Sequence, residues 1–198
     1  HLIVSLGHNP TKIEKRKEIA TSGRLHVWQK RQDVLLKAFA IVLSEHPDCI
    51  LNIYGSGPDE NSLKQLAINL GISSNVRFHG QVSGVDNYLI KNSIFVLTSD
   101  FEGIPNALLE AMALGMPVVS TRCSPGGAEL LIDHGKNGLL VNCGDVDSVA
   151  KQILFYFNYP VRAIEIGAEA RSKMEIFSPE KILQLWKNAI EQSSANAL

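Results

Sequence analysis

The sequence predicts an α/β protein built on a parallel sheet. Short apolar runs rich in Ile, Val and Phe alternate with longer amphipathic stretches along most of the chain, and strands buried on both faces have this apolar composition. Parallel neighbours need long crossover connections, which the amphipathic stretches supply as helices. Six such apolar runs therefore predict a Rossmann-like, six-stranded parallel sheet with helices on both faces.

Each predicted element rests on a local signal. In the helix after the first strand, Leu36, Ala40 and Leu43 recur at three- and four-residue spacing and so share one face. Pro105 favours the first turn of a later helix, which ends before a glycine. The predicted strands are residues 19–22, 49–54, 75–78, 94–97, 117–120 and 138–141. The predicted helices are residues 33–45, 59–70, 85–91, 105–114, 128–132, 147–156, 161–173 and 179–192.

The overall composition argues against several classes of protein. The chain has 198 residues, of which 45% are hydrophobic and 20% charged, as expected for a globular domain. Its net charge of −1 lacks the basic excess of a nucleic-acid-binding protein, so no nucleic-acid partner is expected. Cys49, Cys123 and Cys143 form no CxxC pair, which argues against a disulfide framework or a zinc site and favours a reducing cytoplasm.

Residues 18–192 are predicted to form one ligand-binding domain. Residues 1–17 are interpreted as a linker or the remnant of an interdomain segment, and residues 193–198 as a disordered tail. The linker carries a basic cluster, for which contact with a membrane surface is the alternative to a solvated segment: Lys12, Lys15, Arg16 and Lys17. No apolar run is long enough to span a membrane. We therefore expect a cytoplasmic location, with the inner face of the membrane as the alternative.

The loops that follow the predicted strands carry glycines, cations and polar groups. Ligands of an open parallel sheet bind beyond the carboxyl ends of the strands, and all of these loops project from that edge. Candidate residues after the first three strands are Gly23, Arg24 and Lys30, then Gly55 and Gly57, then Gly80 and Gln81. The sequence therefore predicts a ligand site along this edge of the sheet.

The loop after the fourth strand carries the richest set of candidate groups. It leads into a helix and contains, in order, Glu102, Gly103, Ile104, Pro105 and Asn106, with Glu110 further along the helix. The start of a helix exposes unpaired N–H groups and a positive dipole end, which favour a phosphate. The two glutamates would instead accept hydrogen bonds from sugar hydroxyls. Two carboxylates with a phosphate seat between them predict a nucleotide-sugar site.

These residues also resemble a known family. The block from Phe101 to Val119 resembles the Glu-x7-Glu signature of the family 4 glycosyltransferases, retaining enzymes of the two-domain GT-B fold. Further matches run in the expected order and cover roughly residues 19–157: residues 23–25 with Lys30, residues 54–58, 76–80 and 135–141. The resemblance implies that this chain is the C-terminal, donor-binding half of such an enzyme. It further implies that a separate N-terminal domain supplies the acceptor site.

The resemblance implies a role for each candidate residue. Glu110 would hold the ribose hydroxyls, and Glu102 the hydroxyls of the donor sugar. Arg24 and Lys30 would neutralise the diphosphate leaving group, so Glu102, Arg24 and Lys30 form the candidate catalytic set. The remaining donor-binding candidates are backbone groups of Gly103, Ile104, Pro105 and Asn106, the glycines Gly55 and Gly57, and Gly80 with Gln81 in the base pocket. No metal or other cofactor is expected, because the acidic candidate residues are not arranged as an Asp-x-Asp pair. The nucleotide-diphosphate sugar is the substrate.

Two features depart from the family pattern. Arg31 follows Lys30 where many relatives carry glycine, and the spacer at residues 26–29 is one residue longer than the common version. Three histidines are interpreted as loop or packing residues rather than as the catalytic-region histidine of the absent domain: His26, His79 and His134.

Three other functions compete with a glycosyltransferase that builds surface polysaccharide or another glycoconjugate. A non-catalytic nucleotide-binding module and another GT-B enzyme, such as a nucleotide-sugar epimerase, remain alternatives. An NAD-dependent oxidoreductase is disfavoured, because residues 23–28 lack its Gly-x-Gly-x-x-Gly pattern. The sequence leaves the donor sugar, the base and the acceptor open.

Overall fold

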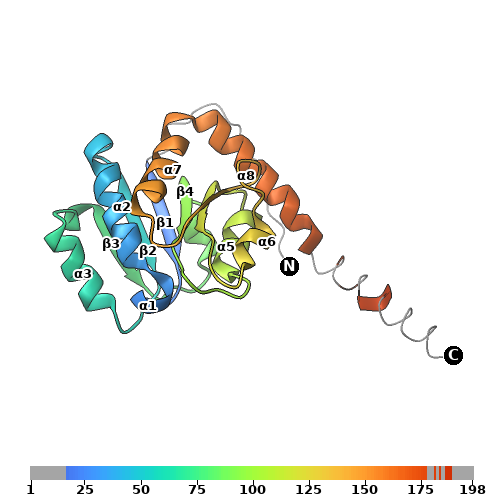
Figure 1. Ribbon diagram of the computed structural model, residues 1–198, viewed down its shortest axis with the longest axis horizontal. Coiled ribbons are helices and arrows are strands. Elements are labelled where there is room, and N and C mark those ends of the chain that lie inside the picture. The colour runs from blue at the N-terminus through green and yellow to red at the C-terminus, as the bar shows by residue number, and fades with distance from the viewer. Residues whose placement is uncertain (1–16, 178–180, 182, 184–185, 189–198) are drawn as a thin grey trace.

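Six parallel strands form one sheet at the centre of the computed structural model, which describes residues 17–177, 181, 183 and 186–188 (Figure 1). The sheet order is β3-β2-β1-β4-β5-β6, and every neighbouring pair is parallel, as predicted. The strands are β1 (Glu18–Ser22), β2 (Ile50–Tyr54), β3 (Val76–Gly80), β4 (Ile94–Leu97), β5 (Val118–Thr121) and β6 (Leu139–Val141).

Helices connect the strands. All six predicted strands and seven of the eight predicted helices overlap observed elements, whereas α1 was not predicted. The predicted helix 179–192 lies mostly outside the described residues, as do the linker assigned to residues 1–17 and the tail assigned to residues 193–198. The α-helices are α1 (Val27–Lys30), α2 (Gln32–Glu45), α3 (Glu60–Asn69), α4 (Asp86–Leu89), α5 (Asn106–Ala113), α6 (Gly127–Leu131), α7 (Val146–Asn158) and α8 (Pro160–Met174).

Both faces of the sheet are covered by helices. Alternate residues of each strand point to opposite faces, so Ile94 and Val96 of β4 join the apolar cluster under α2, α3 and α7, whereas Phe95 and Leu97 join the cluster under α4, α5, α6 and the end of α8. Helices α2 and α7 lie side by side over the first face (Figure 1). Most of the apolar strands are thus buried on both sides, whereas the edge strand β3 leaves Arg77 and His79 exposed.

The strand order reverses direction next to β1. From β1 the chain moves outward through β2 to β3, and it then returns to the other side of β1 to build β4, β5 and β6. The loops that leave β1 and β4 therefore diverge, which opens a crevice at the carboxyl ends of these two strands. The predicted ligand-binding loops after β1, β2, β3 and β4 border this crevice or the adjoining ends of β2 and β3.

Helix α8 packs closely against the loop that follows α5. A Cβ atom on Gly167 of α8 would lie 2.3 Å from the carbonyl oxygen of Gly115. The obstructing atom belongs to the backbone and cannot swing aside as a side chain would. Glycine at this position therefore allows α8 to approach the α5 end of the core.

Replacing Gly167 with alanine tests this contact. Alanine gains up to about 1 kcal/mol of helix propensity over glycine, but overpacking against the Gly115 carbonyl costs about 1–3 kcal/mol. We expect Gly167→Ala to lower the free energy of unfolding, measured by urea denaturation. The control Ser172→Ala, on the exposed side of α8, adds helix propensity without a clash and should leave stability equal or higher. A stabilised Gly167→Ala protein would contradict the predicted clash.

Candidate functional site

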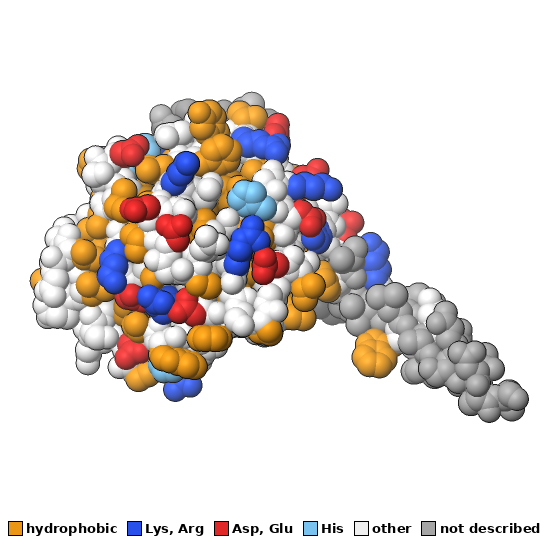
Figure 2. Space-filling view, viewed as in Figure 1, with side chains coloured by type: hydrophobic (Ala, Val, Ile, Leu, Met, Phe, Trp, Pro, Cys, Tyr) orange, Lys and Arg blue, Asp and Glu red, His pale blue; other side chains and the backbone are white. Residues whose placement is uncertain are grey.

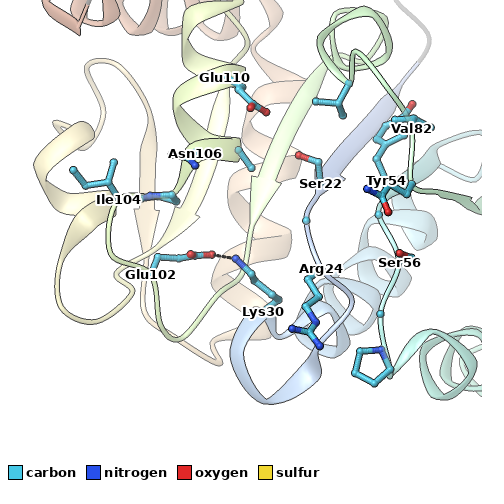
Figure 3. A pocket seen from close by; sticks show the side chains of 18 residues that line it. Ser22, Arg24, Lys30, Tyr54, Ser56, Val82, Glu102, Ile104, Asn106 and Glu110 are labelled. Atoms are coloured by element: carbon cyan, nitrogen blue, oxygen red, sulfur yellow. Dashed lines mark hydrogen bonds and ion pairs between the residues drawn. The ribbon is translucent and has the colours of Figure 1, made fainter. Parts of the chain in front are cut away.

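A cavity of about 940 Å³ opens at the carboxyl edge of the sheet where the strand order reverses (Figure 3). Its volume lies within the usual range for small-molecule sites. The residues that line it come from the loops after β1, β2, β3 and β4 and from the start of α5: Ser22, Gly23, Arg24, Lys30, Tyr54, Gly55, Ser56, Gly57, Pro58, Gln81, Val82, Val85, Glu102, Ile104, Pro105, Asn106, Ala107 and Glu110.

Ten of the twelve residues to which the resemblance gives a role line this cavity: Arg24, Lys30, Gly55, Gly57, Gln81, Glu102, Ile104, Pro105, Asn106 and Glu110. Gly80 and Gly103 are outside the lining set, although each directly adjoins a lining residue in the chain. The structure therefore brings together residues that lie as far as 86 positions apart, between Arg24 and Glu110. Their individual roles in binding stay predictions.

Sequence reasoning missed the apolar side of the cavity. Tyr54 is 5% exposed, and its ring stacks on that of His79 at a centroid distance of 4.6 Å. Val82 and Val85 extend this side after β3. An aromatic residue at the end of a strand, directly before the Gly-Ser-Gly turn, was the available signal for Tyr54. The two valines gave no signal, because apolar loop residues are common in any sequence.

The glycines after β2 pack against the loop after β1. A Cβ atom on Gly55 would lie 1.9 Å from the Gly23 carbonyl oxygen, and one on Gly57 would lie 2.2 Å from the Leu25 carbonyl oxygen. The backbone N–H of Leu25 also donates to the Ser56 carbonyl oxygen at 3.0 Å. These glycines are thus required for contact between two loops, whether or not a ligand touches them. The contact holds the backbone on both sides of Arg24.

The short helix α1 places Lys30 against the loop after β4. The Lys30 ammonium donates to Glu102 Oε1 at 2.5 Å, as Figure 3 shows, and the Ser99 hydroxyl donates to the same oxygen at 2.8 Å. The longer spacer at residues 26–29 thus forms a helical turn, and Lys30 reaches the cavity. An ammonium group has three donors, so Lys30 can hold Glu102 and a second acceptor at once. Arg24 differs, since its exposed guanidinium has no ion-pair partner among the described residues.

The loop that carries Glu102 is supported by the loop after β5. The N–H of Glu102 donates to the Ser124 carbonyl at 2.9 Å, and the Ser124 N–H donates to the Asp100 carbonyl at 2.8 Å. A Cβ atom on Gly127 would lie 1.5 Å from the Gly103 carbonyl oxygen, so the two loops touch through their backbones. This support fixes the direction in which α5, capped by Pro105, presents its first N–H groups.

Glu110 lies in the cavity wall at the far end from Glu102 (Figure 3). Although Glu110 is exposed, partial desolvation in the cavity wall raises the pKa of its carboxyl group, and the nearby charge of Asp86 adds to the shift. Unlike Glu102, Glu110 has no hydrogen-bond or ion-pair partner among the described residues. Its carboxylate oxygens are therefore available to a ligand that donates hydrogen bonds.

The remaining candidate groups stay outside the cavity lining. His26 directly precedes α1. His79 Nε2 forms a hydrogen bond with Asn52 Oδ1 at 2.8 Å, and His134 Nδ1 accepts from the Leu140 N–H at 2.9 Å. These positions agree with the predicted loop and packing roles. In the described part of the chain no three His, Cys, Asp or Glu side chains gather as a metal site. Asp145 and Asp147 do form an Asp-x-Asp segment, but it begins α7 outside the cavity lining, where Asp145 caps the helix.

The cysteines and the lengths of the helices bear on two further expectations from the sequence. Cys49 and Cys123 are buried, whereas Cys143 is exposed, and all three are free thiols. Among the residues that the structure describes, no helix is long and apolar enough to cross a membrane.

The fold and the cavity define a nucleotide-binding half of a GT-B protein, and comparison with known proteins gives its family. The family model described as "Glycosyl transferases group 1" matches residues 16–158. An uncharacterized glycosyltransferase of Haemophilus influenzae is 33% identical over 195 residues, which cover 95% of this chain and 55% of the relative. This chain therefore belongs to the group 1 glycosyltransferases, as the Glu-x7-Glu block predicted.

Solved structures support the same assignment. A TarM variant of S. aureus, solved with fondaparinux, α-GlcNAc-glycerol and UDP, matches with a TM-score of 0.82 and 27% identity over 93% of this chain and 37% of TarM. The C-terminal domain of the group 1 protein LpcC of Francisella tularensis matches with a TM-score of 0.73 and 22% identity, over 83% of this chain and 86% of that domain. The second match shows the fold alone and confirms the predicted C-terminal half of GT-B. The chain spans about half the length of the H. influenzae relative.

The raised pKa of the Glu110 carboxyl group predicts how the stability of the folded chain depends on pH. Because the folded chain binds this proton more tightly than the unfolded chain, the free energy of unfolding falls as pH rises through the folded-state pKa. At neutral pH the carboxylate therefore destabilises the fold. We expect Glu110→Gln to be more stable than the parent chain at pH 7, with the difference shrinking towards about pH 4, where the parent carboxyl is protonated.

Chemical denaturation at both pH values measures this difference. Glu45→Gln is the matched control, because Glu45 is exposed at the end of α2 and outside the cavity lining. A pH-independent difference for Glu110→Gln would show that partial desolvation does not disfavour the charged form there.

Proposed function

We propose that this chain binds a nucleotide-diphosphate sugar and forms the donor half of a retaining glycosyltransferase. The observation that carries the proposal is a single cavity that holds two cations, two carboxylates and the start of a helix: Arg24, Lys30, Glu102, Glu110 and Asn106. The cations and the helix start favour a diphosphate. The carboxylates favour hydroxyl groups on either side of it.

The arrangement supports an orientation for the donor. Glu110 and the apolar side near Val82 suit the nucleoside, with the ribose hydroxyls donating to the Glu110 carboxylate. Lys30 and Glu102 lie at the other end of the cavity and suit the diphosphate and the sugar, respectively (Figure 3). Arg24 lies beside Lys30, so the diphosphate in this orientation meets both cations.

The proposed chemistry is electrostatic. As the bond between the sugar and the phosphate breaks, negative charge grows on the diphosphate, and Arg24, Lys30 and the α5 dipole stabilise it from fixed positions. Glu102 shares Oε1 with the Lys30 ammonium and the Ser99 hydroxyl. Those two hydrogen bonds reduce its strength as a nucleophile, which favours a hydroxyl-binding role over a covalent step. The retaining outcome rests on the family resemblance.

The remainder of the reaction belongs to a protein longer than this chain. TarM was solved with UDP, which makes UDP sugars the first donors to test here. We propose that a second domain supplies the acceptor and closes the cleft, since aligning an acceptor and excluding water need a second wall. A glycan, lipid or small-molecule acceptor in surface polysaccharide or glycoconjugate synthesis fits this scheme, with a cytoplasmic active site.

Calorimetry with a panel of nucleoside diphosphates and their sugars tests donor binding. We expect the chain to bind at least one of them, and Glu110→Gln to weaken that binding roughly tenfold to a hundredfold, because a hydrogen bond to a charged group contributes about 1.5–3 kcal/mol. Glu45→Gln serves again as control and should bind like the parent chain. Failure of the parent chain to bind any member of the panel would sink the proposed donor site.

The exposed cation Arg24 gives an independent test. If its guanidinium faces the diphosphate, Arg24→Ala should weaken binding of the nucleoside diphosphate far more than binding of the bare nucleoside, and should reduce the salt dependence of binding. Arg171→Ala, which removes an exposed charge from α8, is the control. Equal losses for both ligands would mean that Arg24 acts through the fold instead.

A further inference from the structure

Arg31 adopts a backbone conformation that normally favours glycine. Its φ of 48° and ψ of 41° are left-handed, and it is the one non-glycine residue with positive φ among the described residues. This conformation costs an ordinary residue roughly 1–2 kcal/mol. Arg31 is both the C-cap residue of α1 and the N-cap residue of α2, so its backbone sets the angle between the two helices. A compensating interaction must therefore hold this residue in place.

The side chain of Arg31 supplies that interaction. Its Nη1 donates to Asp100 Oδ2 at 2.7 Å, and its Nε donates to Asp33 Oδ1 at 3.1 Å. The hydrogen bond to Asp100, and then that to Asp33, raise the pKa of Arg31 above its usual value. All three side chains are less than a third exposed. One planar guanidinium thus ties the start of α2 to the loop after β4.

Backbone contacts join the same two segments. The buried Thr98 hydroxyl bonds the carbonyls of Lys30 and Arg31 at 3.1 and 2.9 Å, and the Asp100 N–H donates to the Gln29 carbonyl at 2.9 Å. The segment that carries Lys30 is therefore attached to the segment that carries Glu102. The Lys30–Glu102 pair lies beside the Arg31–Asp100 pair in this contact.

We propose that Arg31 is a positioning residue, whose ion pair with Asp100 fixes the left-handed turn and thereby holds the Lys30 ammonium on Glu102 before a donor arrives. The inference rests on the proposed function, which gives Lys30 a diphosphate to meet. Arg31 is outside the cavity lining, and its guanidinium is engaged by two carboxylates. Its effect on a ligand therefore passes through Lys30.

The choice of variants separates charge from backbone strain. Arg31→Gly removes the guanidinium but adopts positive φ at no steric cost, so any loss reflects the missing ion pair. Arg31→Lys keeps the charge but lacks the fork that bonds Asp33 and Asp100 together. Asp100→Asn removes the partner charge. Lys37→Ala is the control, because Lys37 pairs with Asp33 at 3.2 Å from an exposed position on α2.

A ligand-free measurement tests the positioning directly. In ¹⁵N spectra of lysine ammonium groups, a hydrogen-bonded Lys30 should show slow proton exchange in the parent chain, assigned by its loss in Lys30→Ala. We expect fast exchange in Arg31→Gly and Asp100→Asn, an intermediate rate in Arg31→Lys and no change in Lys37→Ala. Slow exchange that persists in Arg31→Gly would overturn the proposal, whatever the chain binds.

A binding measurement tests whether Arg31 affects ligand binding through Lys30. We expect Arg31→Gly to weaken nucleoside diphosphate binding about tenfold, with nucleoside binding unchanged. In a Lys30→Ala background the same change should have no further effect, since Arg31 acts through Lys30. An equal loss in both backgrounds would show direct contact with the phosphate and would overturn the positioning role. If the parent chain binds no nucleoside diphosphate, the proposed function fails, while the exchange measurement still decides the role of Arg31.

Discussion

The reversal of strand order between β1 and β4 is the constraint on which the rest of the site depends. Because right-handed crossovers between parallel strands cover both faces of the sheet with helices, backbone groups are accessible to a ligand at the carboxyl ends of the strands. At the reversal two neighbouring loops leave in opposite directions, and no helix fills the space between them. Arg24 and Lys30 approach this space from the β1 side, and Glu102 and Glu110 approach it from the β4 side.

Close backbone contacts make this crevice rigid. The loop after β1 rests on Gly55 and Gly57, and the loop after β4 rests on Gly127. These glycines leave no room for a side chain, so each contact forms between main-chain atoms that have few alternative positions. The face of the molecule seen in Figure 2 carries both signs of charge with apolar groups between them. The cavity groups are thus held by the scaffold, whereas the exposed side chain of Arg24 can adjust to a ligand.

The sequence predicted the sheet well because the strand signals are local. Residues 94–97 match β4 at both ends, since an apolar run bounded by polar residues has few other interpretations. The Glu102–Glu110 spacing placed both residues at one cavity, because both lie near the start of the same helix. Helix α1 and the turn at Arg31 could not be predicted in this way, because an ion pair with Asp100, 69 positions away, stabilises a conformation that arginine alone disfavours. Sequence patterns report neighbours along the chain and miss such partners.

The two carboxylates of the cavity are prepared for different tasks by their surroundings. Glu102 is charge-compensated by Lys30 within the folded chain, so its desolvation is offset before any ligand binds. Glu110 has no such partner, and partial desolvation together with Asp86 disfavours its charged form. A ligand that donates hydrogen bonds to Glu110 would favour its charged form and so offset the partial desolvation of this carboxylate. The cavity therefore combines one carboxylate paired within the fold with another that has no partner among the described residues, which favours a molecule with hydroxyl groups at one end and a diphosphate further along.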